Sequence, residues 1–464
     1  MKFTNDLGSD NIKGLVWTLA VPSMLSQLVS VLYSIVDRMY IGNIPSNGTQ
    51  ALAGVGVCGP IVTLISSFAF LVGIGGAPLV SINLGEKNID AAKKVIANCF
   101  VYILALAVPV TVLAYIFRRP ILLTFGATEA VYPYAETYFS LYLIGTVFAL
   151  TATGMNQFII TQGHSRSGMF SVLIGAIINI VLDPIFIFAL HMGVAGAAIA
   201  TVISQVASCA FVLCVLFGKH IEVPITFGGY DLKVIGRVTS IGMSAFLIIL
   251  FDNVMLISLN MMLQRYGGDN SDMLLTCNTI VQSFELLITM PLGGLTMGTQ
   301  TILGYNLGAR RPEKILRAQR YIFVIAVSFC ALMTLAAQTI PHLFAGIFTK
   351  EPEYIAMTAR LIRIYTLGTV LLGMQYEIVD GFTGMGVVKI ALPLSVFRKA
   401  VFFACIFILP RFLPIEQIFF CPSRIFPRRS SPFWSTHSPS NALLTAVRKS
   451  RPPDFCKSFP KGLF

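Results

Sequence analysis

Charged residues are scarce in this sequence. Only 12% of its 464 residues are charged, whereas a soluble globular chain carries about 25%. Hydrophobic residues make up 55% of the chain, and the mean hydropathy is +0.78. This composition excludes an ordinary soluble domain and indicates a protein that crosses a membrane many times.

Motifs of metal and redox chemistry are also missing. The nine cysteines form no CxxC pair and fall mostly inside apolar runs, which is typical of packing residues rather than of ligands or disulfides. The five histidines are scattered and form no HExxH motif. We therefore expect no enzyme, no cofactor and no structural metal, which argues against an integral membrane enzyme.

Long apolar runs recur along the chain. A helix of about 20 residues crosses the hydrocarbon core of a bilayer, and runs without β-barrel alternation must satisfy their backbone groups internally as helices. We therefore expect an all-α polytopic membrane protein. Eleven spans are predicted, at about 16–41, 55–82, 96–117, 137–160, 168–190, 193–217, 238–264, 274–303, 321–345, 361–381 and 388–410.

The basic residues set the expected orientation, because cytoplasmic loops are enriched in Lys and Arg. A polar leader, "MKFTNDLGSDNIKG", precedes the first span and shows no cleavable signal. With a cytoplasmic N-terminus, the inward segments hold more basic residues than the outward ones. We predict that orientation in a cell membrane, probably the plasma membrane of a bacterium, and the net charge of +12 requires no nucleic-acid partner.

The second half of the chain repeats the first at an offset of 223 residues. "NLGEKN" at 83–88 aligns with "NLGARR" at 306–311, and "YLIGTV" at 142–147 aligns with "YTLGTV" at 365–370. An even number of helices per repeat relates the two bundles by an axis along the membrane normal, an arrangement typical of transporters that work by alternating access. The predicted domains are an N-terminal bundle at 1–217, a cytoplasmic linker at 218–237, a C-terminal bundle at 238–410 and an atypical tail at 411–464.

Two aspartates lie inside apolar spans of the first half. Asp37 belongs to the first span, and Asp183 lies in "INIVLDPIFIF" of the fifth. Carboxylates at membrane depth cost at least about 2.5 kcal/mol on insertion scales, so they face the bundle interior and mark ion or proton pathways. Asn179 lies one turn before Asp183, and Tyr33 lies one turn before Asp37, so each aspartate shares a helix face with a polar neighbour.

We expect Asp37, Asn179, Asp183 and Thr201 to form an oxygen-rich cavity. Oxygen ligands suit a hard cation, and two close carboxylates in a low dielectric need a bound cation or a shared proton. The candidate metal is therefore a sodium ion at the two aspartates. Pro22 and Pro184 remove helical hydrogen bonds and predict bending points. A purely structural alternative is that Asp37 pairs with the adjacent Arg38 near a helix end.

The C-terminal half is polar in a different pattern. Asn278, Gln282 and Glu285 share one face of the eighth span, and Asp380 lies in the tenth. At the repeat offset, no aspartate corresponds to Asp37 or Asp183. These four polar residues are candidates for a substrate cavity. The alternative is that Arg398 of the eleventh span neutralises Glu285 or Asp380 as a structural pair.

Four stretches resemble the multidrug and toxic compound extrusion (MATE) transporters: "PSMLSQLVSVLYSIVDRMYIGNI", "GIGGAPLVSINLGEKN", "GAIINIVLDPIFIF" and "MGVAGAAIATVISQ". The resemblance covers residues 12–410. It implies twelve helices in two six-helix bundles with a central cleft, and efflux of organic cations or amphiphiles in exchange for sodium ions or protons. It also implies that Asp37, Asn179, Asp183 and Thr201 bind the coupling cation, while Pro22 and Tyr33 act in bending the first helix. The protein is expected to be monomeric.

The end of the sequence departs from that pattern. Residues 421–464 are rich in Pro, Ser and Arg and contain no apolar run that spans a bilayer. We expect that a frameshift or truncation replaced the twelfth helix with a basic tail. The alternative is a genuine regulatory or lipid-binding tail.

Another function consistent with the helix count is a flippase for lipid-linked oligosaccharide precursors, which belongs to a related superfamily. Such a protein is expected to line its cavity with several Lys or Arg for a diphosphate. The membrane-embedded charges of the first half are acidic instead. The sequence therefore favours a cation-coupled exporter of cationic cargo, and a passive channel is disfavoured because a pore needs no kinked, carboxylate-bearing helices.

Overall fold

The computed structural model describes residues 6–45, 48–218, 221–266, 268 and 271–408. Within these residues the fold is all-helical, and eleven helices are long and apolar enough to cross a membrane. Both the fold class and the predicted number of spans are thereby confirmed. The tail at 411–464 lies outside the described residues.

The helices of the first half run from α1 to α7, and those of the second half from α8 to α14. The first set is α1 (Ile12–Gly42), α2 (Gly48–Gly85), α3 (Ile89–Ile116), α4 (Arg118–Thr124), α5 (Tyr132–Thr161), α6 (Ser165–Pro184), the π-helical turn η1 (Ile185–Ala189) and α7 (Gly193–Leu216). The second set is α8 (Leu232–Tyr266), α9 (Ser271–Gly308), α10 (Pro312–Thr339), α11 (Pro341–Phe348), α12 (Pro352–Tyr365), the 3₁₀ turn η3 (Thr366–Gly368), α13 (Thr369–Gly384) and α14 (Val388–Ile408).

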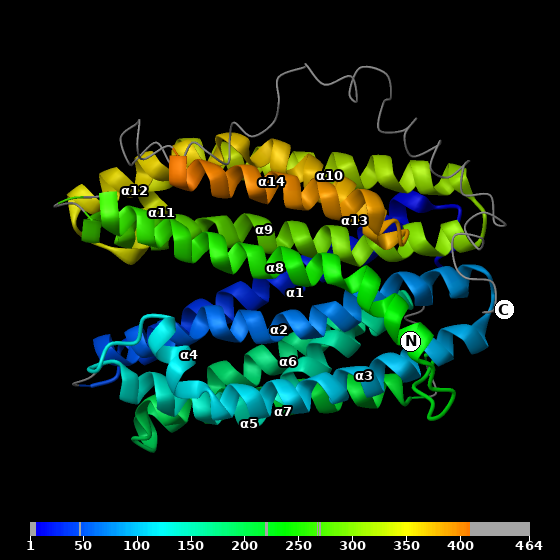
Figure 1. Cartoon of the computed structure of the whole chain (residues 1–464). Coiled ribbons are helices and arrows are strands. Elements are labelled where there is room, and N and C mark those ends of the chain that lie inside the picture. The colour runs from blue at the N-terminus through cyan, green and yellow to red at the C-terminus, as the bar shows by residue number, and fades with distance from the viewer. Residues whose placement is uncertain (1–5, 46–47, 219–220, 267, 269–270, 409–464) are drawn as a thin grey trace.

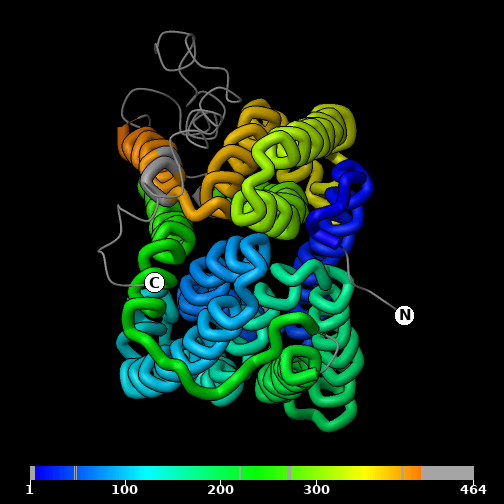
Figure 2. The backbone as a smooth tube through the Cα atoms, turned by 90° about the vertical axis from the view of Figure 1, so that its right-hand side faces the viewer, coloured from blue at the N-terminus to red at the C-terminus, as the bar shows by residue number. Residues whose placement is uncertain are grey.

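The long helices form two bundles that lie side by side with their axes roughly parallel. Figure 1 shows α1–α7 below α8–α14, and Figure 2 shows the same two groups seen end-on. Each bundle has its own hydrophobic core: one is built from α2, α3, α5 and α7, and the other from α9, α10, α12 and α13. These separate cores allow each bundle to hold its shape on its own.

Helix α1 belongs to both bundles. Its first turns place Leu15, Val16 and Leu19 in the core of the second bundle, whereas Ile41 near its end packs in the core of the first. In Figure 1 this dark-blue helix accordingly runs from the upper group to the lower one. Pro22 lies inside the helix, between the two contact regions, where it removes one backbone donor.

The two bundles approach each other most closely at one end, which we call the linker end. This end holds the start of α1, the linker 217–231 and the loop between α9 and α10, and it faces the viewer in Figure 2. A Cβ built on Gly242 of α8 would lie 1.8 Å from the carbonyl oxygen of Leu71 in α2, and one on Gly308 would lie 2.1 Å from that of Ile82. Only glycine permits such backbone contact between helices.

Some element boundaries differ from the sequence-based expectation. The tenth span is not one continuous helix, because a 3₁₀ turn at Thr366–Gly368 separates α12 from α13. The ninth span, expected at 321–345, ends at Thr339, where Pro341 begins the short helix α11. A proline in the first turn of α11 explains the break, since it cannot supply the hydrogen bond that would continue α10.

Candidate functional site

The fifth span carries the most deeply buried polar group of the first bundle. Asp183 is 0% exposed and Asn179 is 2% exposed, both on α6. The amide nitrogen of Asn179 donates to Oδ1 of Asp183 at 3.1 Å and also lies 3.4 Å from the hydroxyl oxygen of Thr201 on α7. One turn of α6 therefore aligns amide and carboxylate, and the α6–α7 contact adds the hydroxyl group.

Asp37 reaches this group from α1. Its carboxyl group faces that of Asp183 within hydrogen-bonding reach. Oδ1 of Asp37, Oδ2 of Asp183 and Oδ1 of Asn179 are buried and have no hydrogen-bond partner among the described residues. The structure thus brings all four residues of the expected cavity together and leaves three oxygen acceptors unpaired.

The local backbone explains how the carboxylate is presented. Pro184 ends α6 directly after Asp183, and the chain continues as the π-helical turn η1. A proline lacks the N–H that a regular helix needs, and π-helical turns often occur at functional sites. Tyr33, one turn before Asp37, lies within electrostatic reach of that carboxyl group, as expected from the sequence.

Tyr138 of α5 was not anticipated from the sequence. Its side chain is 7% exposed, its hydroxyl group lies beside Thr201, and Asp37 is within electrostatic reach. The ring stacks on Tyr142 with centroids 6.3 Å apart. A tyrosine inside an apolar span gives no distinctive signal, so only the packing of α5 against α1 and α7 assigns it to the site.

The donor set suits a small hard cation or a proton. Among the described residues, no three His, Cys, Asp or Glu side chains gather as a metal site. The site instead offers two carboxylates, an amide oxygen and a hydroxyl oxygen, which are the ligand types of hard cations. A bound cation or a shared proton would relieve the repulsion between the two carboxylates.

The candidate residues of the second bundle lie in separate pairs. Asn278 donates to Oδ1 of Asn260 at 2.8 Å, and Glu285 accepts a hydrogen bond of 2.5 Å from the hydroxyl of Tyr365. Thr296 donates to Oδ2 of Asp380 at 2.5 Å. Gln282 is partly buried on α9, on the face predicted for it, so these residues line the bundle without forming one shared cluster.

A buried ion pair links α8 to α14. Lys399 binds Asp252, and the side chain of Lys399 is 4% exposed while that of Asp252 is 51% exposed. Arg398 had been considered as a partner for Glu285 or Asp380. In the described residues its guanidinium instead lies over the ring of Tyr376, 5.9 Å from the centroid. The adjacent lysine therefore provides the ion pair of this helix.

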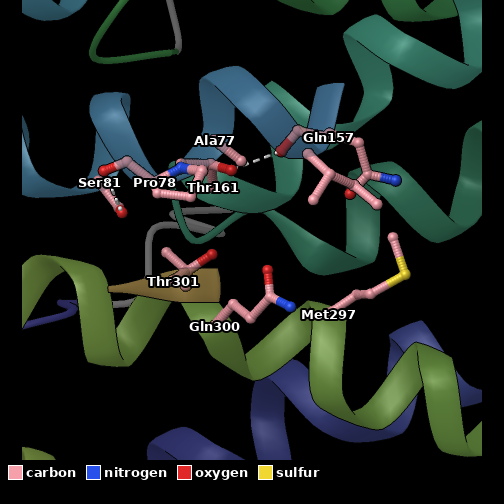
Figure 3. A pocket seen from close by; sticks show the side chains of 10 residues that line it. Ala77, Pro78, Ser81, Gln157, Thr161, Met297, Gln300 and Thr301 are labelled. Carbon is pink, nitrogen blue, oxygen red and sulfur yellow. Dashed lines mark hydrogen bonds between the residues drawn. The ribbon is translucent and has the colours of Figure 1, made fainter. Parts of the chain in front are cut away.

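A small cavity lies between the bundles near the linker end. Figure 3 shows Ala77, Pro78 and Ser81 of α2 opposite Met297, Gln300 and Thr301 of α9. Gln157 and Thr161 of α5 complete its wall. The cavity is lined by short polar and apolar side chains and holds no charged group.

Comparisons with known proteins agree with this architecture. The MatE family model matches residues 22–185 and 244–406, once in each half of the chain. Relatives include "Multidrug export protein MepA" of Staphylococcus aureus (strain MSSA476), 26% identical over 371 residues and covering 79% of both chains. The protein of the same name from Staphylococcus haemolyticus (strain JCSC1435) is 26% identical over 370 residues, again with 79% of each chain covered.

Solved structures share the fold. One is described as the outward-facing conformation of a multidrug resistance MATE family transporter of the MOP superfamily; it has a TM-score of 0.86 and 22% identity, covering 96% of this chain and all of that one. Another, a MOP superfamily transporter from Pyrococcus furiosus, has a TM-score of 0.84 and 22% identity, covering 98% and 99%. With the family model matching both halves, the chain belongs to the MatE family, a family of multi-span membrane transporters rather than enzymes.

Proposed function

We propose that this protein exports organic cations and related amphiphilic drugs in exchange for a sodium ion or a proton. The names of its relatives support the cargo, since the MepA proteins are described as multidrug exporters. The observation that carries the coupling is the facing pair Asp37 and Asp183, which has unpaired oxygens at the depth of the spans. Asn179 and Thr201 complete the set, and Tyr138 borders it.

Coupling follows from the position of α1. One end of this helix packs in the core of the second bundle, and Asp37 at the other end faces the first. A cation that draws Asp37 toward Asp183 therefore pulls on a helix that both bundles hold, and Pro22 lies where that helix has to bend. Binding energy at the site is in this way transmitted to the angle between the bundles.

The same mechanism assigns a state to the structure. With the N-terminus in the cytoplasm, the linker end is the cytoplasmic end, and its close backbone contacts seal that side. Asp37 lies fourteen residues beyond Ser23, the residue of α1 that Gly294 of α9 approaches. At 1.5 Å per residue this places the carboxylate about 21 Å from the sealed end, so the site is reached from outside in this state.

A lipid-linked oligosaccharide flippase fits less well. Recognition of a diphosphate calls for several available cations in the cavity, whereas Lys399 is already bound to Asp252 and the first bundle presents two facing acids. The arrangement of charges favours cationic cargo.

The test is efflux of a fluorescent organic cation from membrane vesicles, driven by an imposed sodium or proton gradient. Asp37→Asn and Asp183→Asn should each abolish the dependence of efflux on the gradient. Asp90→Asn is the matched control, because Asp90 is exposed at the start of α3 and its side chain is 98% accessible. Gradient-driven efflux that persists in both site variants would refute the proposal.

A further inference from the structure

The interior of the second bundle holds a group of charged and phenolic side chains from five helices. Asp252 of α8, Glu285 of α9, Tyr365 of α12, Tyr376 of α13 and Arg398 of α14 lie within electrostatic reach of one another, together with Lys399. The first bundle, by contrast, brings two acids together with no base between them. The two halves of the repeat therefore differ in the charge that they present.

Most of these groups are paired directly. Lys399 binds Asp252, and the hydroxyl of Tyr365 donates to Oε2 of Glu285. Each acid of the group thus has one close donor. Arg398 is the member that these contacts leave over.

Arg398 forms no ion pair or hydrogen bond with the described residues. Its guanidinium lies over the ring of Tyr376, and its Nε is buried without a hydrogen-bond partner. A guanidinium has five N–H donors in a planar fork that fits a carboxylate bidentately. Unpaired donors at membrane depth are costly, so an acceptor is expected at this place.

The group lies beyond the contact that seals the bundles. Asp252 follows Gly242 by ten residues in α8, and Glu285 precedes Gly294 by nine residues in α9. At 1.5 Å per residue both carboxylates lie about 14 Å from those close contacts, toward the far end. Both α8 and α9 pack against the first bundle through these glycines, so the group belongs to the half of the molecule where the bundles are not in backbone contact.

We propose that Arg398 is the subsite for a carboxylate of the transported molecule, and that the protein therefore carries zwitterionic amphiphiles as well as simple organic cations. This inference rests on the proposed export function and names a further substrate class for it. The guanidinium binds the carboxylate, Tyr376 supports the guanidinium plane, and the nearby Glu285 attracts the cationic part of the same molecule.

The surroundings limit the size of the anionic group. Glu285 and Asp252 both lie close enough to repel added negative charge, and Lys399 is committed to Asp252. One guanidinium in this setting balances a single negative charge. A carboxylate meets that condition, whereas a diphosphate does not.

Two matched dyes test the proposal. Rhodamine 110 has a free carboxylate, and rhodamine 123 is its methyl ester, so the pair differs only in the group assigned to Arg398. Their dissociation constants are measured by fluorescence polarisation on the purified full-length protein, without any ion gradient. In Arg398→Gln, binding of rhodamine 110 should weaken about tenfold, the size expected for loss of a charge-assisted hydrogen bond, while binding of rhodamine 123 stays the same or tightens.

Controls separate this role from a structural one. Arg398→Lys keeps the charge and should restore much of the preference for the free acid, which a packing defect would not allow. Arg363→Gln removes an exposed arginine from the neighbouring helix α12 and should leave both dyes unaffected. Equal weakening of both dyes in Arg398→Gln, or no change in either, would overturn the assignment.

The result is independent of the coupling mechanism. Dye selectivity is an equilibrium property of the second bundle, whereas coupling is measured as gradient-driven efflux in variants of Asp37 and Asp183. A normal dye preference with uncoupled efflux would contradict the proposed coupling alone. Coupled efflux with no effect of Arg398→Gln on dye preference would contradict the subsite alone.

Discussion

The carboxyl groups of Asp37 and Asp183 face each other across α1 and α6, although 146 positions separate them in the sequence. In the repeat, the helices that correspond to α1 and α6 are α8 and α14. That second pair also carries a contact between charged residues, but there Lys399 of α14 binds Asp252 of α8. At the offset of 223, Asp37 corresponds to Asn260 and Asp183 to Ile406. One bundle thus presents two acids to an exchangeable cation, and the other supplies its own cation.

Tyr138→Phe should weaken the coupling-cation site without disrupting the bundle. The substitution removes only the hydroxyl group beside Thr201 and Asp37, and a lost hydrogen bond of about 1 kcal/mol corresponds to roughly fivefold in affinity. The measurement is the cation concentration that gives half-maximal efflux. Tyr134→Phe, one turn earlier and near Gln50, is the control, and an equal change in both variants would remove Tyr138 from the site.

Gly294→Ala should prevent the linker end from closing. The added Cβ would lie 2.5 Å from the carbonyl oxygen of Ser23, whereas a Cβ on the adjacent Gly293 has nothing within 4 Å. We expect export to fall at least about tenfold in Gly294→Ala, because a backbone atom cannot move aside as a flexible side chain does. Gly293→Ala should transport normally. Comparable rates in the two variants would show that close contact between α1 and α9 is not required.

The two partners of the buried ion pair should differ in their effect on stability. Asp252→Asn leaves the buried Lys399 uncompensated and should lower the free energy of unfolding by about 3 kcal/mol. Lys399→Met leaves a carboxylate that is already 51% exposed, and we expect a smaller loss. The double variant should recover part of the loss, as thermal unfolding of the purified protein would show. Additive losses would mean that the two side chains do not interact.

The leader before α1 docks on α10, and its docking should depend on pH. Lys314 binds Oδ1 of Asp10 at 2.7 Å and donates to the backbone oxygen of Gly8 at 2.6 Å. The hydrogen bond and charge of Lys314 lower the pKa of Asp10 below its ordinary value of 3.8. The contribution of this pair is therefore complete above pH 3.8 and is lost as the pH falls through the lowered pKa.

Amide hydrogen exchange of residues 7–9, corrected for intrinsic rates, measures this docking. At neutral pH, Lys314→Ala should expose these amides to faster exchange, because both the ion pair and the backbone contact are removed. Below the lowered pKa the wild-type protein and the variant should become more alike. Lys13→Ala removes an exposed lysine nearby and should have little effect, so similar exchange in all three proteins would exclude a docked leader.

Much of the candidate site was predictable from local sequence. Asp37 and Asp183 stand out because each is a carboxylate in an apolar run, and helical spacing places Asn179 on the face of Asp183. The partners of Glu285 and Asp380 were not predictable, since Tyr365 and Thr296 are ordinary residues of membrane helices. The same holds for Tyr138 and for Lys399, which the sequence places directly beside the more conspicuous Arg398.

The sequence by itself determined the number of spans, the repeat and the polar face of each helix, because hydrophobic length and helical period are local properties of the chain. Tertiary structure decided which faces meet: that α1 is shared by two bundles, that Lys399 rather than Arg398 binds Asp252, and that the bundles touch through glycines at the linker end. These features depend on the fit of side chains from distant segments, and a helical period sets the direction of a side chain along its own helix without specifying the surface that it will contact.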